Sequence, residues 1–163
     1  RAGHRILLLG SDEQVRDSLA IYSEELEKAV ASGDITPEQA ADRGGSAGVL
    51  RQIHVADDSV AAIDAVRSST TWSMRVAKAL ANMGPVPLTE RDFTELDLPE
   101  VDPDEVERIL RHRVVAGDAN HVRARLQHLR EIGVGEVLCW TRWGFLTHEQ
   151  ATESMRRLSE HVL

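Results

Sequence analysis

Short apolar segments alternate with amphipathic helices along this chain, and this alternation constrains the fold more than any other feature. The apolar segments are residues 5–9, 49–55 and 136–140, and a helical pattern follows each of them. Strands that are separated by helices are typically parallel and buried beneath those helices. The sequence therefore predicts an α/β fold in which a small parallel sheet is covered by helices.

The last part of the chain shows this alternation most clearly. Asp118 is placed to cap a helix that ends at Gly133, and the strand 136–140 follows directly. That strand runs into the polar and aromatic segment 140–144 instead of returning to the core. Thr147 then begins the final helix with the spacing of a capping box. An exposed, aromatic strand end of this kind is typical of a ligand-binding rim.

The rest of the chain is predicted to contain a helix over 11–31, one helical turn near 36–39 and a long helix over 57–84. Residues 85–104 contain four of the five prolines and little periodicity, which predicts a long, mobile loop. Such a loop is interpreted either as a lid over an active site or as an ordinary surface loop. A short helix over 104–111 and a brief extended segment over 114–117 follow it.

Composition excludes several classes of function. A net charge of −8 in 163 residues, with the cationic side chains interleaved among acids, argues against a nucleic-acid surface. No apolar run approaches the roughly 20 residues of a membrane span, and no signal peptide is evident. The single cysteine, Cys139, excludes an internal disulfide and is typical of the reducing cytoplasm. The histidines show no metal-ligand spacing, so no metal is expected.

Chain length limits the architecture. The predicted strands form either a small three-layer sheet or three neighbouring strands of a (β/α)8 barrel. A complete barrel takes about 250 residues, which is more than this chain contains.

Several segments resemble the C-terminus of the bacterial-luciferase-like flavin monooxygenases. The resemblance lies in residues 115–118, 131–138 and 144–149, and it extends to the strands at 2–8 and 50–57. Two departures are Phe145, where the family often has a second glycine, and Asp118-Ala119, where it usually has a polar residue and proline. About the first half of the family's barrel, with much of its cofactor site, has no counterpart here.

This resemblance implies that residues 1–163 form about three βα units of a TIM-type barrel. It implies a monooxygenase that uses O2 and reduced FMN, supplied by a flavin reductase, to oxidise a small organic substrate, as in natural-product biosynthesis. A deazaflavin is the alternative cofactor. The expected partners are the N-terminal half of the barrel, on a separate or cleaved chain, and a second copy in a homodimer.

Five residues are the candidates for the site, because the chemistry of such barrels collects at the carboxyl ends of the strands. His54 is the candidate catalytic residue, and Ser11 and Arg142 are candidates for cofactor binding. Trp140 and Trp143 are candidates for the wall of a substrate pocket. Each has a structural alternative: Ser11 caps a helix, Arg142 stacks on a tryptophan, His54 is a partly satisfied structural histidine, and the tryptophans pack the rim.

Two other functional classes stay open. One alternative to the monooxygenase is a non-catalytic interaction module that kept this part of the fold. The other is an independent α/β domain with three parallel strands. Because three strands cannot close a barrel of eight, the chain alone is not expected to be a competent enzyme.

Overall fold

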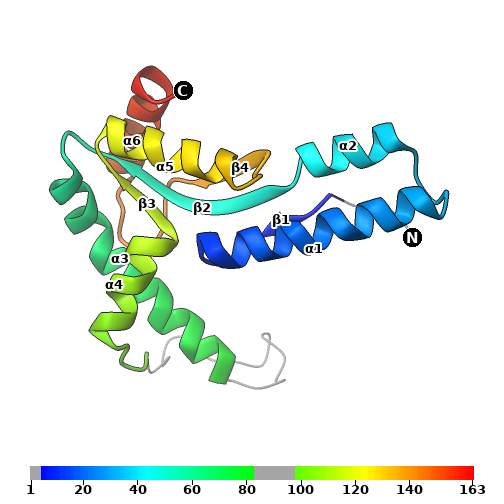
Figure 1. Cartoon of the computed structure of the whole chain (residues 1–163). Helices are drawn as coiled ribbons and strands as arrows, with labels where there is room; N and C mark the ends of the chain where they lie inside the picture. Colours follow the sequence, from blue (N-terminus) through cyan, green and yellow to red (C-terminus); the bar gives the residue numbers. More distant parts are fainter. Residues whose placement is uncertain (1–4, 83–97) are drawn as a thin grey trace.

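The computed structural model describes residues 5–82 and 98–163 as six helices around a small parallel sheet (Figure 1). The helices and strands, in chain order, are β1 (Leu7–Leu8), α1 (Asp12–Ala31), α2 (Pro37–Gly45), β2 (Gly48–Val55), α3 (Ser59–Asn82), α4 (Pro103–His112), β3 (Val114–Gly117), α5 (Ala119–Glu131), β4 (Glu136–Trp140) and α6 (His148–His161). The predicted α/β fold with a parallel sheet is confirmed.

Strand β2 is the centre of the sheet, because each of the other three strands pairs with it in parallel. The amides of Gly48 and Ala56 donate to Ile6 and Gly117, which places β1 and β3 along the same edge of β2. Strand β4 lies along the other edge, where Gly135 donates to the carbonyl of Ala47. The three predicted strands therefore lie side by side, with β2 between β1 and β4.

Residues 114–117, expected only as an extended segment, form the fourth strand. All four residues of β3 are buried, and β3 pairs with the second half of β2, from Gln52 to Val55. Consequently β4 neighbours β2 and not β3, although β3 and β4 are consecutive along the chain. In a (β/α)8 barrel each strand pairs with the next strand along the chain, whereas β3 and β4 do not pair here.

One face of the sheet is covered along its whole length. Side chains alternate along a strand, so Val49, Ile53 and Val55 share this face. They pack against α1, α5 and α6 in two clusters of buried residues. The members of these clusters are Val15, Val49, Ile53, Val55, Val115, Val122, Leu129, Val134, Leu158 and Val162.

The opposite face is covered over only half of its length. Helices α3 and α4 pack on β3, where Val66 and Leu110 meet Val114, Ala116 and Trp143. The first half of β2, together with β1 and β4, has no such cover, and Leu7 and Leu138 are each 55% exposed there. The exposed part of this face, formed by the first half of β2 with β1 and β4, is called the uncovered face.

Helices α1, α5 and α6 begin where their caps Ser11, Asp118 and Thr147 were predicted. Three helices have complete capping boxes, in which a hydroxyl accepts from the third helical amide and a glutamine reaches back to the cap amide: Ser11 with Gln14, Thr36 with Gln39, and Thr147 with Gln150. Helix α2 runs for nine residues where only one turn was predicted. Its continuation through Ala40 and Ala41 is supported by packing against α1.

The predicted loop 85–104 lies mostly outside the described residues. Its described end, residues 98–102, is irregular, and Pro103 begins α4. Arg75 of α3 donates to the carbonyls of Leu98 and Pro99 at 2.5 and 3.0 Å. The entry into α4 is thus fixed on α3.

Helices α1 and α2 form a hairpin that projects away from the rest of the molecule (Figure 1). Of the 20 residues of α1 only Val15 is buried, and none of α2 is buried. This α1–α2 hairpin contrasts with the packed body, defined as β2, β3 and α3–α6.

Candidate functional site

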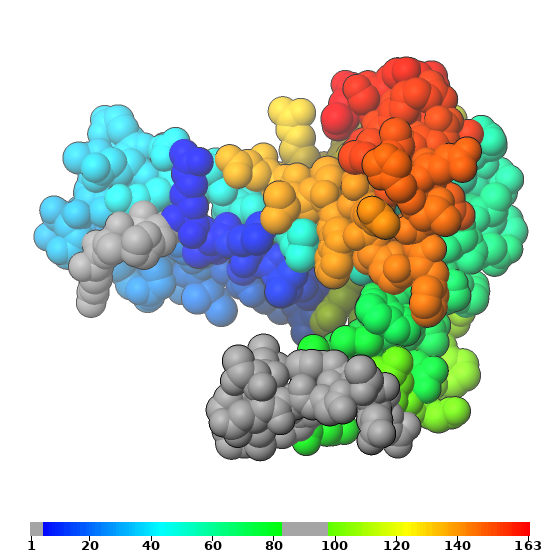
Figure 2. All heavy atoms as spheres, turned by 180° about the vertical axis from the view of Figure 1, so that it is seen from behind, coloured from blue at the N-terminus to red at the C-terminus, as the bar shows by residue number. Residues whose placement is uncertain are grey.

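The uncovered face is the place where most candidate residues gather. Because registered residues of parallel strands point to the same side, Leu138 and Trp140 of β4 lie beside Leu50 and Gln52 of β2. Figure 2 shows β4 (orange) and the segment that contains β1 (dark blue) at the surface on this side. Trp140 is 44% exposed. The face is therefore an apolar surface with one amide, Gln52, at its centre.

His54 lies on the same side of β2 as Gln52, at the point where the cover begins. It pairs with Ala116 of β3 and is only 5% exposed. Burial lowers the pKa of His54, and the positive charge of Arg157 lowers it further. The imidazole is accordingly neutral at neutral pH. Its Nδ1 is buried and has no hydrogen-bond partner among the described residues, which agrees with the partly satisfied structural histidine of the alternative interpretation.

Trp140 and Arg142 lie together at the carboxyl end of β4. The indole Nε1 of Trp140 donates to the backbone carbonyl of Arg142 at 2.6 Å. This bond orients the indole while its ring stays partly exposed. Arg142 is exposed, and no described residue forms an ion pair with its guanidinium. The pair thus offers an aromatic surface and a free cation at one end of the uncovered face.

Trp143 is placed differently from Trp140. It is 3% exposed and packs in the cluster formed by α3, α4 and β3. The turn that places Trp143 in this cluster needs a glycine at position 144. The φ of Gly144 is 55°, and a Cβ atom added there would lie 2.7 Å from Cα of Ser69. Ser69 also accepts a hydrogen bond from the amide of Phe145 at 2.9 Å. Trp143 therefore packs in the core, as in the packing alternative, whereas the ring of Trp140 stays partly exposed.

Three buried polar atoms without a partner belong to this same region. They are Nδ1 of His54, Nε1 of Trp143 and Oγ1 of Thr70, which follows Ser69 on α3. A buried donor or acceptor that lacks a partner costs about 1–3 kcal/mol. Such unsatisfied groups are a recognised property of functional sites.

Ser11 is committed to its helix. Its Oγ accepts from the amide of Gln14 at 3.3 Å, and its own amide donates to Oε1 of Gln14 at 2.9 Å. A bound phosphate would have to displace the Gln14 side chain to reach these amides. The capping role was the alternative interpretation of Ser11, and it accounts for both contacts.

The sequence interpretation missed a buried charge network. Arg51 is 1% exposed and donates to Oδ1 of Asp12 at 3.0 Å. Arg125 Nη2 lies 3.0 Å from Oδ2 of the same carboxylate, as an ion pair without the angle of a hydrogen bond. The network joins α1, β2 and α5. Its sequence signal is an arginine between Val49 and Ile53 on the covered face, because a charge there needs a buried partner.

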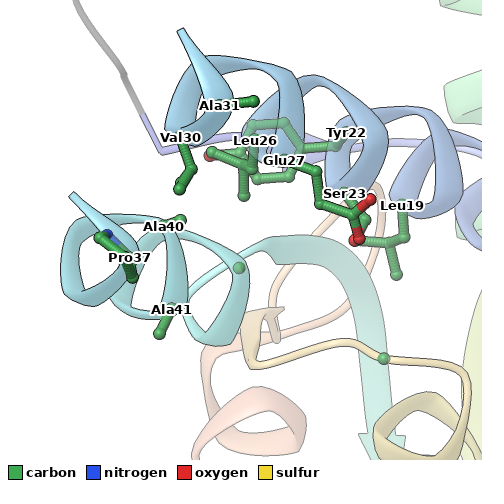
Figure 3. A pocket seen from close by; sticks show the side chains of 12 residues that line it. Leu19, Tyr22, Ser23, Leu26, Glu27, Val30, Ala31, Pro37, Ala40 and Ala41 are labelled. Carbon is green, nitrogen blue, oxygen red and sulfur yellow. The ribbon is translucent and has the colours of Figure 1, made fainter. Parts of the chain in front are cut away.

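A cavity lies outside the candidate site and the buried charge network. It has a volume of about 660 Å³ and lies between α1 and α2 (Figure 3). Its lining includes Gly44, which precedes β2, and Gly133, which precedes β4. The cavity is therefore near the amino ends of the strands, opposite to the end where ligands of parallel sheets bind.

Residues 5–82 and 98–163 contain neither a metal-binding cluster nor a helix that could span a membrane. No group of three or more His, Cys, Asp or Glu side chains there is arranged to hold a metal ion. None of the helices in the same ranges has the length and apolar character needed to span a bilayer.

Comparison with known proteins gives likenesses to solved structures, one of them a monooxygenase. No protein-family profile and no curated protein matches the chain. Monooxygenase RslO1 from Streptomyces bottropensis, a crystal structure, matches 99% of this chain with a TM-score of 0.57 and 19% sequence identity. The match covers 41% of the RslO1 chain, so this chain spans less than half of that protein's length. At this identity the likeness shows the α/β fold alone.

Proposed function

We propose that this chain forms the C-terminal part of a flavin-dependent monooxygenase of the luciferase-like type. In this proposal the uncovered face is the inner wall of a barrel, and the missing strands complete that wall. The observation that carries the proposal is the exposed apolar face of a parallel sheet, with Trp140 and Arg142 at its carboxyl end. A sheet face of this kind needs a cover of protein or ligand.

The likeness to RslO1 supports this interpretation of the uncovered face. Nearly the whole chain matches, whereas more than half of RslO1 has no counterpart here. A further part that packs on the uncovered face would bury Leu7, Leu138 and Trp140. The N-terminal half of the barrel is the proposed occupant, and a flavin reductase is the proposed source of reduced cofactor.

The residues present fit a flavin in part. Trp140 offers a ring for stacking, and the free guanidinium of Arg142 suits an anionic group such as the phosphate of FMN or of a deazaflavin. Ser11 does not fit without loss of its capping box. When bound, the reduced flavin supplies the reaction of O2 with an organic substrate. The residues of this chain bind and orient the reactants.

His54 is the candidate catalytic group of this chain. Because its pKa is lowered, the imidazole stays neutral at neutral pH and offers a hydrogen bond without carrying a charge. Its unpartnered Nδ1 is the atom available for a hydrogen bond. Burial under α3 excludes bulk water from this atom, which strengthens such a bond.

The experiment is a titration with reduced and oxidised FMN, and with a deazaflavin, of the chain alone and of the chain mixed with a polypeptide that supplies the remaining strands. We expect tight binding and substrate-dependent incorporation of labelled oxygen only in the mixture. Trp140→Ala and Arg142→Gln should each weaken binding about tenfold or more, a loss of about 1.4 kcal/mol or more. Trp72→Phe, on α3, is the matched control and should bind normally.

The same titration tests the second candidate function, a non-catalytic interaction module. The apolar cavity of the α1–α2 hairpin favours this candidate, because it suits a protein partner as well as a cofactor. A mixture that assembles, as shown by sedimentation, yet binds neither flavin nor deazaflavin would rule out the monooxygenase and leave the module.

A further inference from the structure

The α1–α2 hairpin has an apolar groove that its own side chains do not fill. Leu19, Tyr22, Leu26 and Val30 recur along α1 with helical spacing and line one side of the cavity, where Leu19 lies beside Gly133 (Figure 3). The opposite wall consists of short side chains: Pro37, Ala40, Ala41 and Gly44. Because these side chains cannot reach across to α1, a cavity of about 660 Å³ remains.

The hairpin also concentrates the negative charge of the protein. Residues 12–45 contain nine acidic and three basic side chains, so the hairpin has a net charge of −6, most of the −8 of the whole chain. One of the acids, Glu27, is part of the lining of the groove, and its side chain is exposed. An apolar groove on an acidic hairpin is complementary to a surface that is apolar in its centre and basic at its edges.

We propose that the α1–α2 hairpin docks an amphipathic helix of another protein, with Leu, Ile or Phe side chains on one face and Lys or Arg beside them. This is the helix-in-groove mode of recognition. The groove follows α1 from Leu19 to Val30, about 16–18 Å, which accommodates a partner helix of about three turns. The apolar face of that helix fills the cavity, and its cations meet Glu27 and the neighbouring acids.

The proposal does not depend on the monooxygenase. The groove lies near the amino ends of β2 and β4, whereas the proposed flavin residues are at the carboxyl end of β4. Binding at the groove is therefore measured without any flavin present.

The experiment uses the full chain and a designed peptide of about 16 residues, with leucines at helical spacing flanked by lysines and a fluorescent label. We expect one peptide to bind per chain with a Kd on the order of 10–100 μM at low salt. Raising NaCl from 50 to 500 mM should weaken binding several-fold, because exposed charges are screened. The control peptide has glutamate at every lysine position and should not bind.

Paired variants locate the site on the chain. Leu26→Glu places a charge in the groove and should abolish binding, whereas Ile21→Glu, at an exposed position outside the lining, should leave it unchanged. Glu27→Lys should weaken binding about tenfold, and Glu149→Lys on α6 is its control. Circular dichroism checks folding, and if Leu26→Glu unfolds, the two charge variants alone decide the question.

Several results would overturn the proposal. These are no binding of the basic peptide, equal binding of the acidic peptide, and equal effects of Leu26→Glu and Ile21→Glu in folded proteins. Self-association of the chain that Leu26→Glu abolishes and the peptide does not reverse would assign the groove to a second copy instead.

Discussion

The α1–α2 hairpin and the packed body reach their stability by different means. In the packed body, β3 buries every residue and α3 buries five. In the hairpin, α1 buries one residue of 20, and its remaining support is the pairing of Asp12 with Arg51 and Arg125, a capping box, and partial packing on α2. Both regions contain regular helices, but only the packed body is fully packed. Secondary structure alone therefore does not indicate which parts of a fold are fully packed.

The largest effect is expected where the hairpin joins the sheet. Asp12→Ala leaves the buried charge of Arg51 without its main partner, which should cost about 3–5 kcal/mol in urea unfolding. Asp17→Ala, at an exposed position on the same helix, should change stability by less than about 0.5 kcal/mol. The double variant Asp12→Ala/Arg51→Met should recover most of the loss. Equal losses for Asp12→Ala and Asp17→Ala would show that the network does not anchor the hairpin.

The next effect compares one core position of each region. Ile53→Ala removes a fully buried side chain and should cost about 2–5 kcal/mol. Leu26→Ala, in the hairpin, removes a side chain that is half-buried and already borders a cavity, so it should cost less than about 1 kcal/mol. Both are measured by urea unfolding monitored by circular dichroism. A loss at Leu26 as large as that at Ile53 would mean that the hairpin is packed in solution.

In the pH range in which histidines titrate, a pH effect is expected in the packed body, at His54. Because the pKa of folded His54 is lowered, the unfolded chain binds a proton first as the pH falls. Stability should be unaffected above about pH 6.5 and should decrease below it, by at most about 1.4 kcal/mol per pH unit from this residue. His54→Asn should show a shallower decrease between pH 6.5 and 5 in urea unfolding. An unchanged slope would exclude a depressed pKa.

The smallest effect compares two matched helix caps. Thr36→Ala and Thr147→Ala each remove a hydroxyl that accepts a hydrogen bond from a backbone amide, that of Gln39 at 3.2 Å and that of Gln150 at 3.1 Å. Each of these caps stabilises its helix by about 1 kcal/mol. In the packed body, Thr147→Ala should lower global stability by that amount. In the hairpin, Thr36→Ala should instead speed amide hydrogen exchange across α2 with little global effect. Equal global losses would show that hairpin and body unfold as one unit.

Local signals in the sequence were sufficient to predict much of the fold. The caps at Ser11, Asp118 and Thr147, and strand β4 over 136–140, depend on neighbouring residues and lie where they were expected. Strand β3 was not recognised as a full strand, because four residues carry little periodicity and its stability comes from β2, some 60 residues away. Helix α2 was underestimated because Gly44 and Gly45 weaken the helical pattern.

In the candidate site, too, the features that depend on neighbouring residues were predictable, and those that depend on distant residues were not. Trp140 and Arg142 lie at the exposed end of β4, which follows from the strand and from the direction of parallel sheets. The burial of Trp143 depends on the close approach of Gly144 to Ser69, 75 residues apart, and no local pattern specifies it. The pairing of Asp12 with Arg51 is non-local in the same way. Contacts of this kind are set by the assembled fold.

The length of α1 has a mechanical consequence. A helix of 20 residues spans about 30 Å, and this one is held mainly in its first turns, by Asp12 and Val15. A tilt of about 5° about those turns moves the far end by about 2–3 Å and the anchored end by far less. The hairpin is thus expected to pivot about Arg51, the residue next to Gln52 in β2. A movement of the far end of α1 would therefore be transmitted to the strand that forms the centre of the uncovered face.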